Sequence, residues 1–280
     1  MIVITKKKYY SERKGMLQDT PIDFEMLKKI FLMSYEELEK EIYFQEAIGY
    51  TCVDAGRIEG KWGNDFEAFI YTKIKMRNIW SIQDNIASYD EPTFFTIVEF
   101  LYDYVSEPID EYKRYHSWNN CGWHCTKFDK EKGQEKYRNK MNEILKDYDE
   151  GYHLTNDGEI QKIPSSGYED LIEEPIETDD PENIDNRIKN AISKYFRYGS
   201  TFDDKKEAIR ILSDVMEYLK KDGIVLPSKD DSDLFQIINR FDIRHHNKQQ
   251  ISNYDKELWY DWMFYTFLAS IKVLVKIKDQ

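Results

Sequence analysis

The residues best suited to chemistry stand in one short stretch, Asn239-Arg240-Phe241-Asp242-Ile243-Arg244-His245-His246-Asn247. It holds two of the chain's five histidines side by side, directly after an arginine. A guanidinium stabilises phosphate charge, and an imidazole carries protons near neutral pH. The pattern therefore indicates a site that acts on a phosphate. The alternative interpretation is a polar helix end, at which cations meet the negative end of the helix dipole.

A second polar group lies in the first half of the chain. Four residues of metal-binding type fall within ten positions, namely His116, Cys121, His124 and Cys125. Structural zinc usually takes two ligand pairs separated by a longer loop. Because these residues come as one crowded group and Cys52 is distant in sequence, we expect no stoichiometric zinc and no other cofactor. We expect packed loop residues instead, anchored by Trp118 and Trp123; a catalytic Cys121–His124 dyad would lack an orienting partner.

Composition limits the class of protein. The 280 residues are 41% hydrophobic and 15% aromatic, which is enough apolar material for a substantial core. The net charge of −13 comes from residues 147–185, which hold 14 acidic residues and one lysine; the remainder is neutral, so RNA is not excluded as a substrate. Three cysteines do not make a disulfide framework, and the apolar stretch 258–277 carries charges unlike a membrane span. We expect a cytoplasmic protein without a membrane partner.

Apolar spacing predicts a mainly α-helical chain in two parts. In the first half, helices are expected over residues 24–42, after Asp90-Glu91-Pro92, and over residues 137–148. Asn156-Asp157-Gly158 predicts a tight hairpin turn, one of few β elements. We expect a helical domain with a small hairpin over residues 1–165, followed by an acidic connector over residues 166–183.

The second half, residues 184–280, has the pattern of a four-helix bundle. The first two helices are expected to run from Ile184 to Tyr195 and from Ala208 to Leu219, closed by Gly199 and Gly223. A third is expected from Ser232 through Leu234, Phe235, Ile238 and Phe241. The fourth, from about residue 254, is apolar nearly all round, as expected of a central helix.

These residues suggest a family. The carboxyl-terminal bundle, with Arg240 followed after four or five residues by His245 or His246, resembles HEPN domains, whose signature is an arginine and a histidine at this spacing. The first half is similar to the domains that precede HEPN modules in AbiJ-type abortive-infection proteins, in residues 95–102 and from residue 137 through the hairpin. The resemblance implies a bacterial antiviral-defence toxin: a metal-independent endoribonuclease that pairs two motifs in a homodimer.

Carried over to this chain, the resemblance makes Arg240 and His245 or His246 the catalytic pair. Arg244 is a rival for the arginine role, and Asn239 or Asn247 would orient an imidazole, with Asp242 a further candidate. RNA would be the substrate, and an antitoxin or another defence protein a possible partner. The alternative is a non-catalytic helical interaction or ligand-sensing protein, in which the Arg-His cluster forms a dimer interface.

Overall fold

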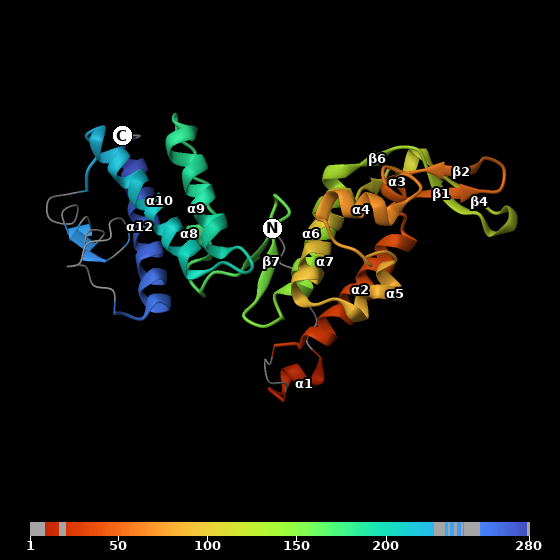
Figure 1. Cartoon of the computed structure of the whole chain (residues 1–280), viewed down its shortest axis with the longest axis horizontal. Helices are drawn as coiled ribbons and strands as arrows, with labels where there is room; N and C mark the ends of the chain where they lie inside the picture. Colours follow the sequence, from red (N-terminus) through yellow and green to blue (C-terminus); the bar gives the residue numbers. More distant parts are fainter. Residues whose placement is uncertain are drawn as a thin grey trace. The chain divides into compact units, whose positions relative to one another are not determined.

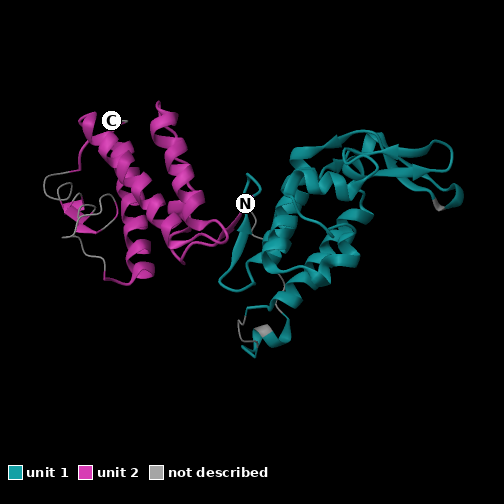
Figure 2. Cartoon of the chain, in the orientation of Figure 1, with its two compact units in different colours: residues 1–158 teal, residues 159–280 magenta. Residues whose placement is uncertain are grey.

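The computed structural model describes residues 9–16, 21–226, 233–234, 236–237, 240–241, 243 and 253–278. It is mainly helical, as the sequence predicts, and it also contains several small two-stranded sheets. The chain forms two compact units, Met1–Gly158 and Glu159–Gln280 (Figures 1 and 2). The division falls in the turn of the predicted hairpin: its first strand, β7 (Tyr152–Leu154), belongs to unit 1, and its second, β8 (Ile160–Lys162), belongs to unit 2.

Unit 1 combines helices with short hairpins. Its helical segments are α1 (Tyr10–Arg13), α2 (Phe24–Lys40), α3 (Gln45–Ile48), α4 (Phe66–Ile74), α5 (Ile82–Asn85), η1 (Ile86–Ser88), α6 (Glu91–Tyr104), η2 (Asp110–Tyr112), η3 (Trp118–Asn120) and α7 (Lys130–Leu145). Its other strands are β1 (Gly49–Cys52), β2 (Gly56–Glu59), β3 (Glu107–Pro108), β4 (Lys113–His116), β5 (Gly122–Cys125) and β6 (Phe128–Asp129).

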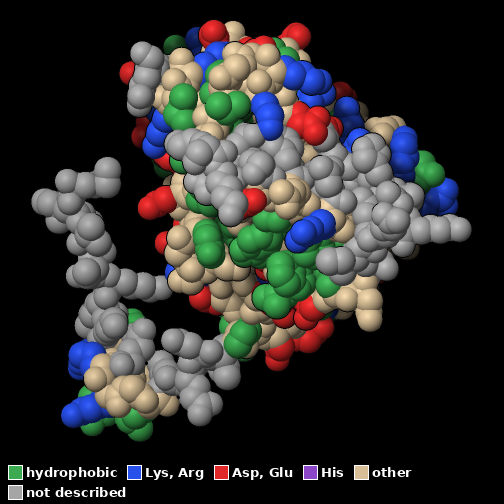
Figure 3. Space-filling model, turned by 90° about the vertical axis from the view of Figure 1, so that its left-hand side faces the viewer, with side chains coloured by type: hydrophobic (Ala, Val, Ile, Leu, Met, Phe, Trp, Pro, Cys, Tyr) green, Lys and Arg blue, Asp and Glu red, His purple; other side chains and the backbone are tan. Residues whose placement is uncertain are grey.

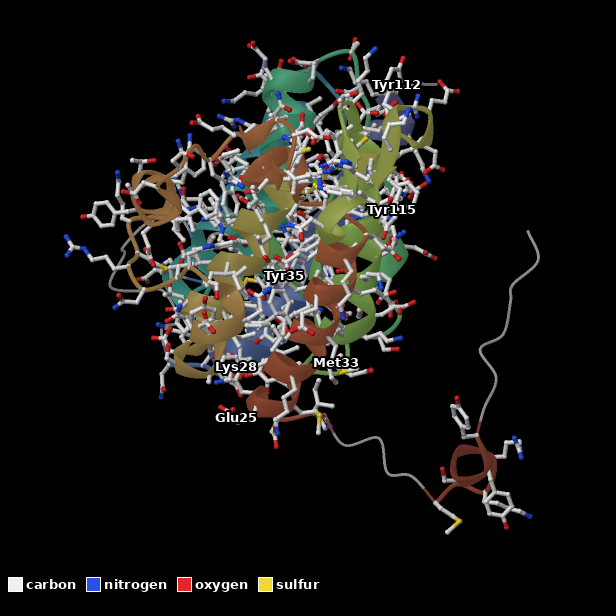
Figure 4. The ribbon with its side chains drawn as sticks, turned by 90° about the vertical axis from the view of Figure 1, so that its right-hand side faces the viewer. Glu25, Lys28, Met33, Tyr35, Tyr112 and Tyr115 are labelled. Atoms are coloured by element: carbon white, nitrogen blue, oxygen red, sulfur yellow. The ribbon has the colours of Figure 1, made fainter. Side chains whose placement is uncertain are left out.

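The core of unit 1 lies between α2, α6 and α7, the three helices that the sequence predicts. Each begins after an aspartate whose side chain accepts a backbone N–H of the first turn, at Asp23, Asp90 and Asp129. Tyr35 of α2 is buried among these helices (Figure 4). The buried hydroxyl of Tyr137 donates a 3.0 Å hydrogen bond to the Val98 carbonyl, which ties α7 to α6.

The expectation of few β elements was wrong for unit 1. In the described residues, β1 pairs with β2, β3 with β6, and β4 with β5, all antiparallel. These strands have two to four residues, and every residue of β2 is exposed. Because they bury little, they carry no alternation of apolar and polar residues long enough to predict a strand.

Gly133 marks a close approach of α7 to the chain before β3. A Cβ atom at this position would lie 2.4 Å from the Ser106 Cα atom and 2.6 Å from the Glu107 nitrogen. Alanine in a helix interior normally stabilises by about 1 kcal/mol over glycine. We expect the opposite for Gly133→Ala, a loss of about 1–3 kcal/mol, because the contact is with backbone that cannot rotate away.

The measurement is urea unfolding of the full chain, with Lys132→Ala as the control. Lys132 is an exposed neighbour on the same helix, so its replacement should change stability by less than about 0.5 kcal/mol. A Gly133→Ala protein as stable as the wild type would show that α7 does not pack this closely.

Unit 2 is a helical bundle. Its helices with described bounds are α8 (Glu169–Glu173), the π-helical turn η4 (Pro181–Asp185), α9 (Asn186–Phe196), α10 (Phe202–Lys221) and α12 (Lys256–Lys278). Helix α10 packs against both α9 and α12, so α10 is the central helix of the described bundle. The expectation that the last helix is central was wrong: α12 buries residues along its length but leaves Trp262 and Val273 exposed. Gly199 and Gly223 both have positive φ after their helices. The expected helix from Ser232 includes Phe235 and Ile238, which lie outside the described residues.

The acidic segment 166–183 belongs to unit 2. Leu171, Ile172 and Ile176 pack against the core of this unit. Lys272 of α12 lies 3.0 Å from the Glu174 carboxylate, and Lys278 pairs with Asp179. Part of the negative charge of this segment is therefore matched by lysines of α12. Within the described residues, no helix is both long and apolar enough to cross a lipid bilayer.

Candidate functional site

The carboxyl-terminal Arg-His stretch is described only at three positions. Arg240 is exposed, whereas Phe241 and Ile243 are buried in the core of unit 2. Asn239, Asp242, Arg244, His245, His246 and Asn247 lie outside the described residues. The pairing of an arginine with a histidine in this stretch therefore stays a prediction.

Aromatic contacts hold the described part of this stretch against the start of α12. The Phe241 ring lies 5.0 Å from the Tyr254 ring and 5.2 Å from the Trp259 ring. The Phe241 N–H donates to the Ile237 carbonyl at 3.1 Å. Arg240 is thus presented at the surface by a segment whose next residue is anchored in the bundle.

The structure brings together a second group of side chains, in unit 1. One ligand atom each from Cys52, His116, Cys121 and His124 lies within 4.8 Å of all the others. All four side chains are partly buried. We call this group the Cys2His2 cluster.

Two hairpins position the Cys2His2 cluster. Cys52 is the last residue of β1, at the turn into β2. His116 ends β4 opposite Gly122, Cys121 directly precedes β5, and His124 lies within β5. Gly122 has φ +90°, a conformation that allows the chain to re-enter the strand after Cys121. One hairpin therefore supplies three members and the other supplies one.

The spacing of the four atoms suits a tetrahedral metal ion. Bonds of about 2.3 Å to sulphur and about 2.05 Å to nitrogen keep a sulphur and a nitrogen about 3.6 Å apart on one zinc ion. The Cys52 Sγ–His116 Nδ1 distance is 3.6 Å, and the Cys121 Sγ–His124 Nε2 distance is 3.1 Å. Two thiolates and two imidazoles are also the donor types that zinc prefers.

The surroundings of the cluster orient its members. The second ring nitrogen of His116, Nε2, lies 3.3 Å from the Asp54 carboxylate, the partner that commonly fixes a metal-binding histidine. Backbone N–H groups of Ala55 and Asp54 lower the pKa of the Cys52 thiol to about 7. Burial raises the pKa of the Cys121 thiol. Burial, and then the nearby His116, lowers the pKa of His124, which favours its neutral, metal-binding form.

The structure replaces one member of the group identified from sequence. Cys125 is buried, with its sulphur 3.0 Å from the Lys127 carbonyl, and it is not in the cluster. Cys52, set aside as too distant, takes the fourth place. No local pattern around Cys52 marks it as a member, because its partners lie 64 or more residues away in the sequence.

The expectation that Trp118 and Trp123 anchor the loop was wrong. Trp118 is 72% exposed and Trp123 is 45% exposed. Trp123 packs against its cross-strand neighbour Tyr115, which lies at the surface on β4 (Figure 4). These rings therefore do not bury the loop 117–121.

Comparison of the chain with protein-family models, with curated proteins and with solved structures finds no match. The site is therefore interpreted from its own residues.

Proposed function

We propose that this protein is an endoribonuclease toxin of a bacterial antiviral-defence system, and that unit 2 is a HEPN-like bundle carrying its active site. The observation that best supports the proposal is the placement of the three described residues of the Arg-His stretch. Phe241 and Ile243 enter the core, while Arg240 is exposed. A polar segment fixed in this way on a rigid bundle can hold catalytic groups in place.

The proposed chemistry is internal transesterification of RNA. One histidine of the pair His245 and His246 takes the proton of a 2′-hydroxyl, whose oxygen forms a bond to phosphorus. The bond from phosphorus to the 5′-oxygen breaks, and that oxygen receives a proton from the second imidazole. Arg244 or Arg240 stabilises the charge that develops on the phosphate oxygens. The products are a 2′,3′-cyclic phosphate and a 5′-hydroxyl.

A homodimer forms part of the proposal, with one motif from each copy in a composite active site. Apolar side chains in the first two turns of α12 are exposed, namely Leu258, Trp259 and Trp262. Figure 3 shows hydrophobic side chains gathered on the face of unit 2 that it views. Because Trp259 also contacts Phe241, a second copy docked on this end of α12 would lie next to the Arg-His stretch.

We expect the wild-type chain to be a dimer at micromolar concentration. The substitution Trp262→Glu should raise the dissociation constant of this dimer at least tenfold. A charge at the centre of an apolar interface is costly to bury. Light scattering after size exclusion gives the mass. Val273→Glu, an exposed position on the last third of the same helix, is the control and should remain dimeric. A strictly monomeric wild type would contradict the composite site.

The exposed surface of α12 also favours a second candidate function, that of a non-catalytic interaction protein. Tryptophan is enriched where proteins bind one another. In that case the Arg-His stretch would belong to the interface, and substitutions there would weaken assembly without any activity to lose.

Incubation of the purified protein with total tRNA and rRNA, in buffer without added divalent ions, distinguishes the two candidates. The ribonuclease proposal expects discrete cleavage products. Intact RNA, together with harmless overexpression in a bacterial host, would leave the interaction protein as the better account.

A further inference from the structure

We infer that Cys52, His116, Cys121 and His124 bind one structural zinc ion, which fastens the β1–β2 hairpin to the β4–β5 hairpin. The inference rests on the placement of four ligand atoms within 4.8 Å of one another by two segments that are far apart in sequence. It is independent of the ribonuclease proposal, since the cluster lies in unit 1 and the Arg-His stretch lies in unit 2.

The donor set indicates a structural ion rather than a catalytic one. Catalytic zinc sites keep one coordination position open for water or substrate, whereas structural sites use four protein ligands. Here four protein side chains stand together, which is the number of ligands that a closed structural site uses. The Asp54 carboxylate acts on His116 from outside this set, through the ring nitrogen opposite the one that faces Cys52.

Such an ion would stabilise the two hairpins. An isolated two-stranded hairpin is marginally stable in water. The strand β2 is exposed throughout, and the only buried residue in β1, β2, β4 and β5 is Cys125. Gln45 of α3 donates to the Trp123 carbonyl at 2.9 Å and accepts the Cys125 N–H at 2.8 Å, which holds the end of β5. The two hairpins also touch each other, because the rings of Tyr50 and His124 lie 4.2 Å apart. The ion would join the turn of the β1–β2 hairpin to the turn of the β4–β5 hairpin.

A disulfide between Cys52 and Cys121 is the main rival. Both thiols are free in this structure. A disulfide would use two members of the cluster and give no role to His116 and His124, although both imidazoles face the sulphurs. A metal uses all four.

The experiment measures metal content in the full-length protein, purified with reductant and without chelator. We expect elemental analysis by inductively coupled plasma mass spectrometry to find one zinc ion per wild-type chain. Cys52→Ser should lower zinc at least tenfold, because three ligands hold the ion more weakly than four. Cys125→Ser is the matched control: this cysteine is only four residues from Cys121 but outside the cluster, so zinc should stay at one per chain.

Two measurements on the wild type keep the inference testable if Cys52→Ser fails to fold. Cobalt(II) in place of zinc should give the intense visible bands of a tetrahedral site, with a sulphur-to-metal charge-transfer band. Removal of the ion with a strong chelator should lower the melting temperature of unit 1 by several degrees, restored by added zinc.

Three outcomes would overturn the inference. The wild type could contain no zinc even after incubation with the metal under reducing conditions. A Cys52–Cys121 disulfide could form in its place in protein purified without an oxidant. Zinc could be lost in Cys125→Ser and kept in Cys52→Ser, which would assign a different set of ligands.

Discussion

Alanine substitution of Arg240, Arg244 or His245 is expected to lower the rate of RNA cleavage about 10²- to 10⁴-fold each. The reason is that each would remove either a proton carrier or a charge that stabilises the transition state. A side chain that acts on RNA must reach solvent and contributes little to folding, so we expect melting temperatures within a degree or two of the wild type. Cleavage rates under single-turnover conditions, and growth inhibition on expression, give the two readouts.

Arg187→Ala is the control for these variants. Arg187 is an exposed arginine on α9 of the same unit, outside the motif, and its loss should leave cleavage unchanged. The opposite result would be variants that melt at lower temperature or lose the dimer, while their remaining folded fraction cleaves RNA at the wild-type rate. That result would show that the Arg-His residues stabilise the structure and do not act in catalysis.

Replacement of Phe264 by alanine is expected to destabilise unit 2 by about 3–5 kcal/mol, the usual range for a fully buried phenylalanine. Phe264 is completely buried on α12 and stacks on Tyr195 of α9 at 4.0 Å between ring centroids. It also meets the Phe196 ring edge-on at 5.5 Å. The cavity would open between α9 and α12.

Hydrogen exchange followed by mass spectrometry locates this effect. Faster exchange is expected in α9, α10 and α12, and unchanged exchange in α2, α6 and α7, because the two units have separate cores. Val273→Ala, at an exposed position of α12, should change neither. Equal loss of protection in both units would contradict the division of the chain after Gly158.

The helices could be predicted from sequence because their signals are local. Asp90 before Pro92, and apolar residues at helical spacing on α6, are visible in a single stretch of chain, and the structure has this helix from Glu91. The hairpins β1–β2 and β4–β5 could not be predicted in the same way. Their short strands are largely exposed, so their sequences show no alternation of apolar and polar residues.

The cluster was identified only in part for a related reason. Its membership depends on the contact between Cys52 and His116, which lie 64 residues apart, and no local spacing encodes such a contact. Cys125 was grouped with the other three residues because the strand β5 was not predicted. Successive residues of a strand point to opposite faces, so His124 and Cys125 of β5 cannot both reach one ion.

The central claim is that the protein cleaves RNA by attack of a 2′-hydroxyl, and the chemistry at the ends of its products tests this most directly. The purified wild-type protein is incubated with tRNA, and the fragments are analysed by mass spectrometry. The account predicts 2′,3′-cyclic phosphates, each matched by a 5′-hydroxyl on the adjoining fragment. Fragments with 5′-phosphates, or tRNA that stays intact, would contradict it.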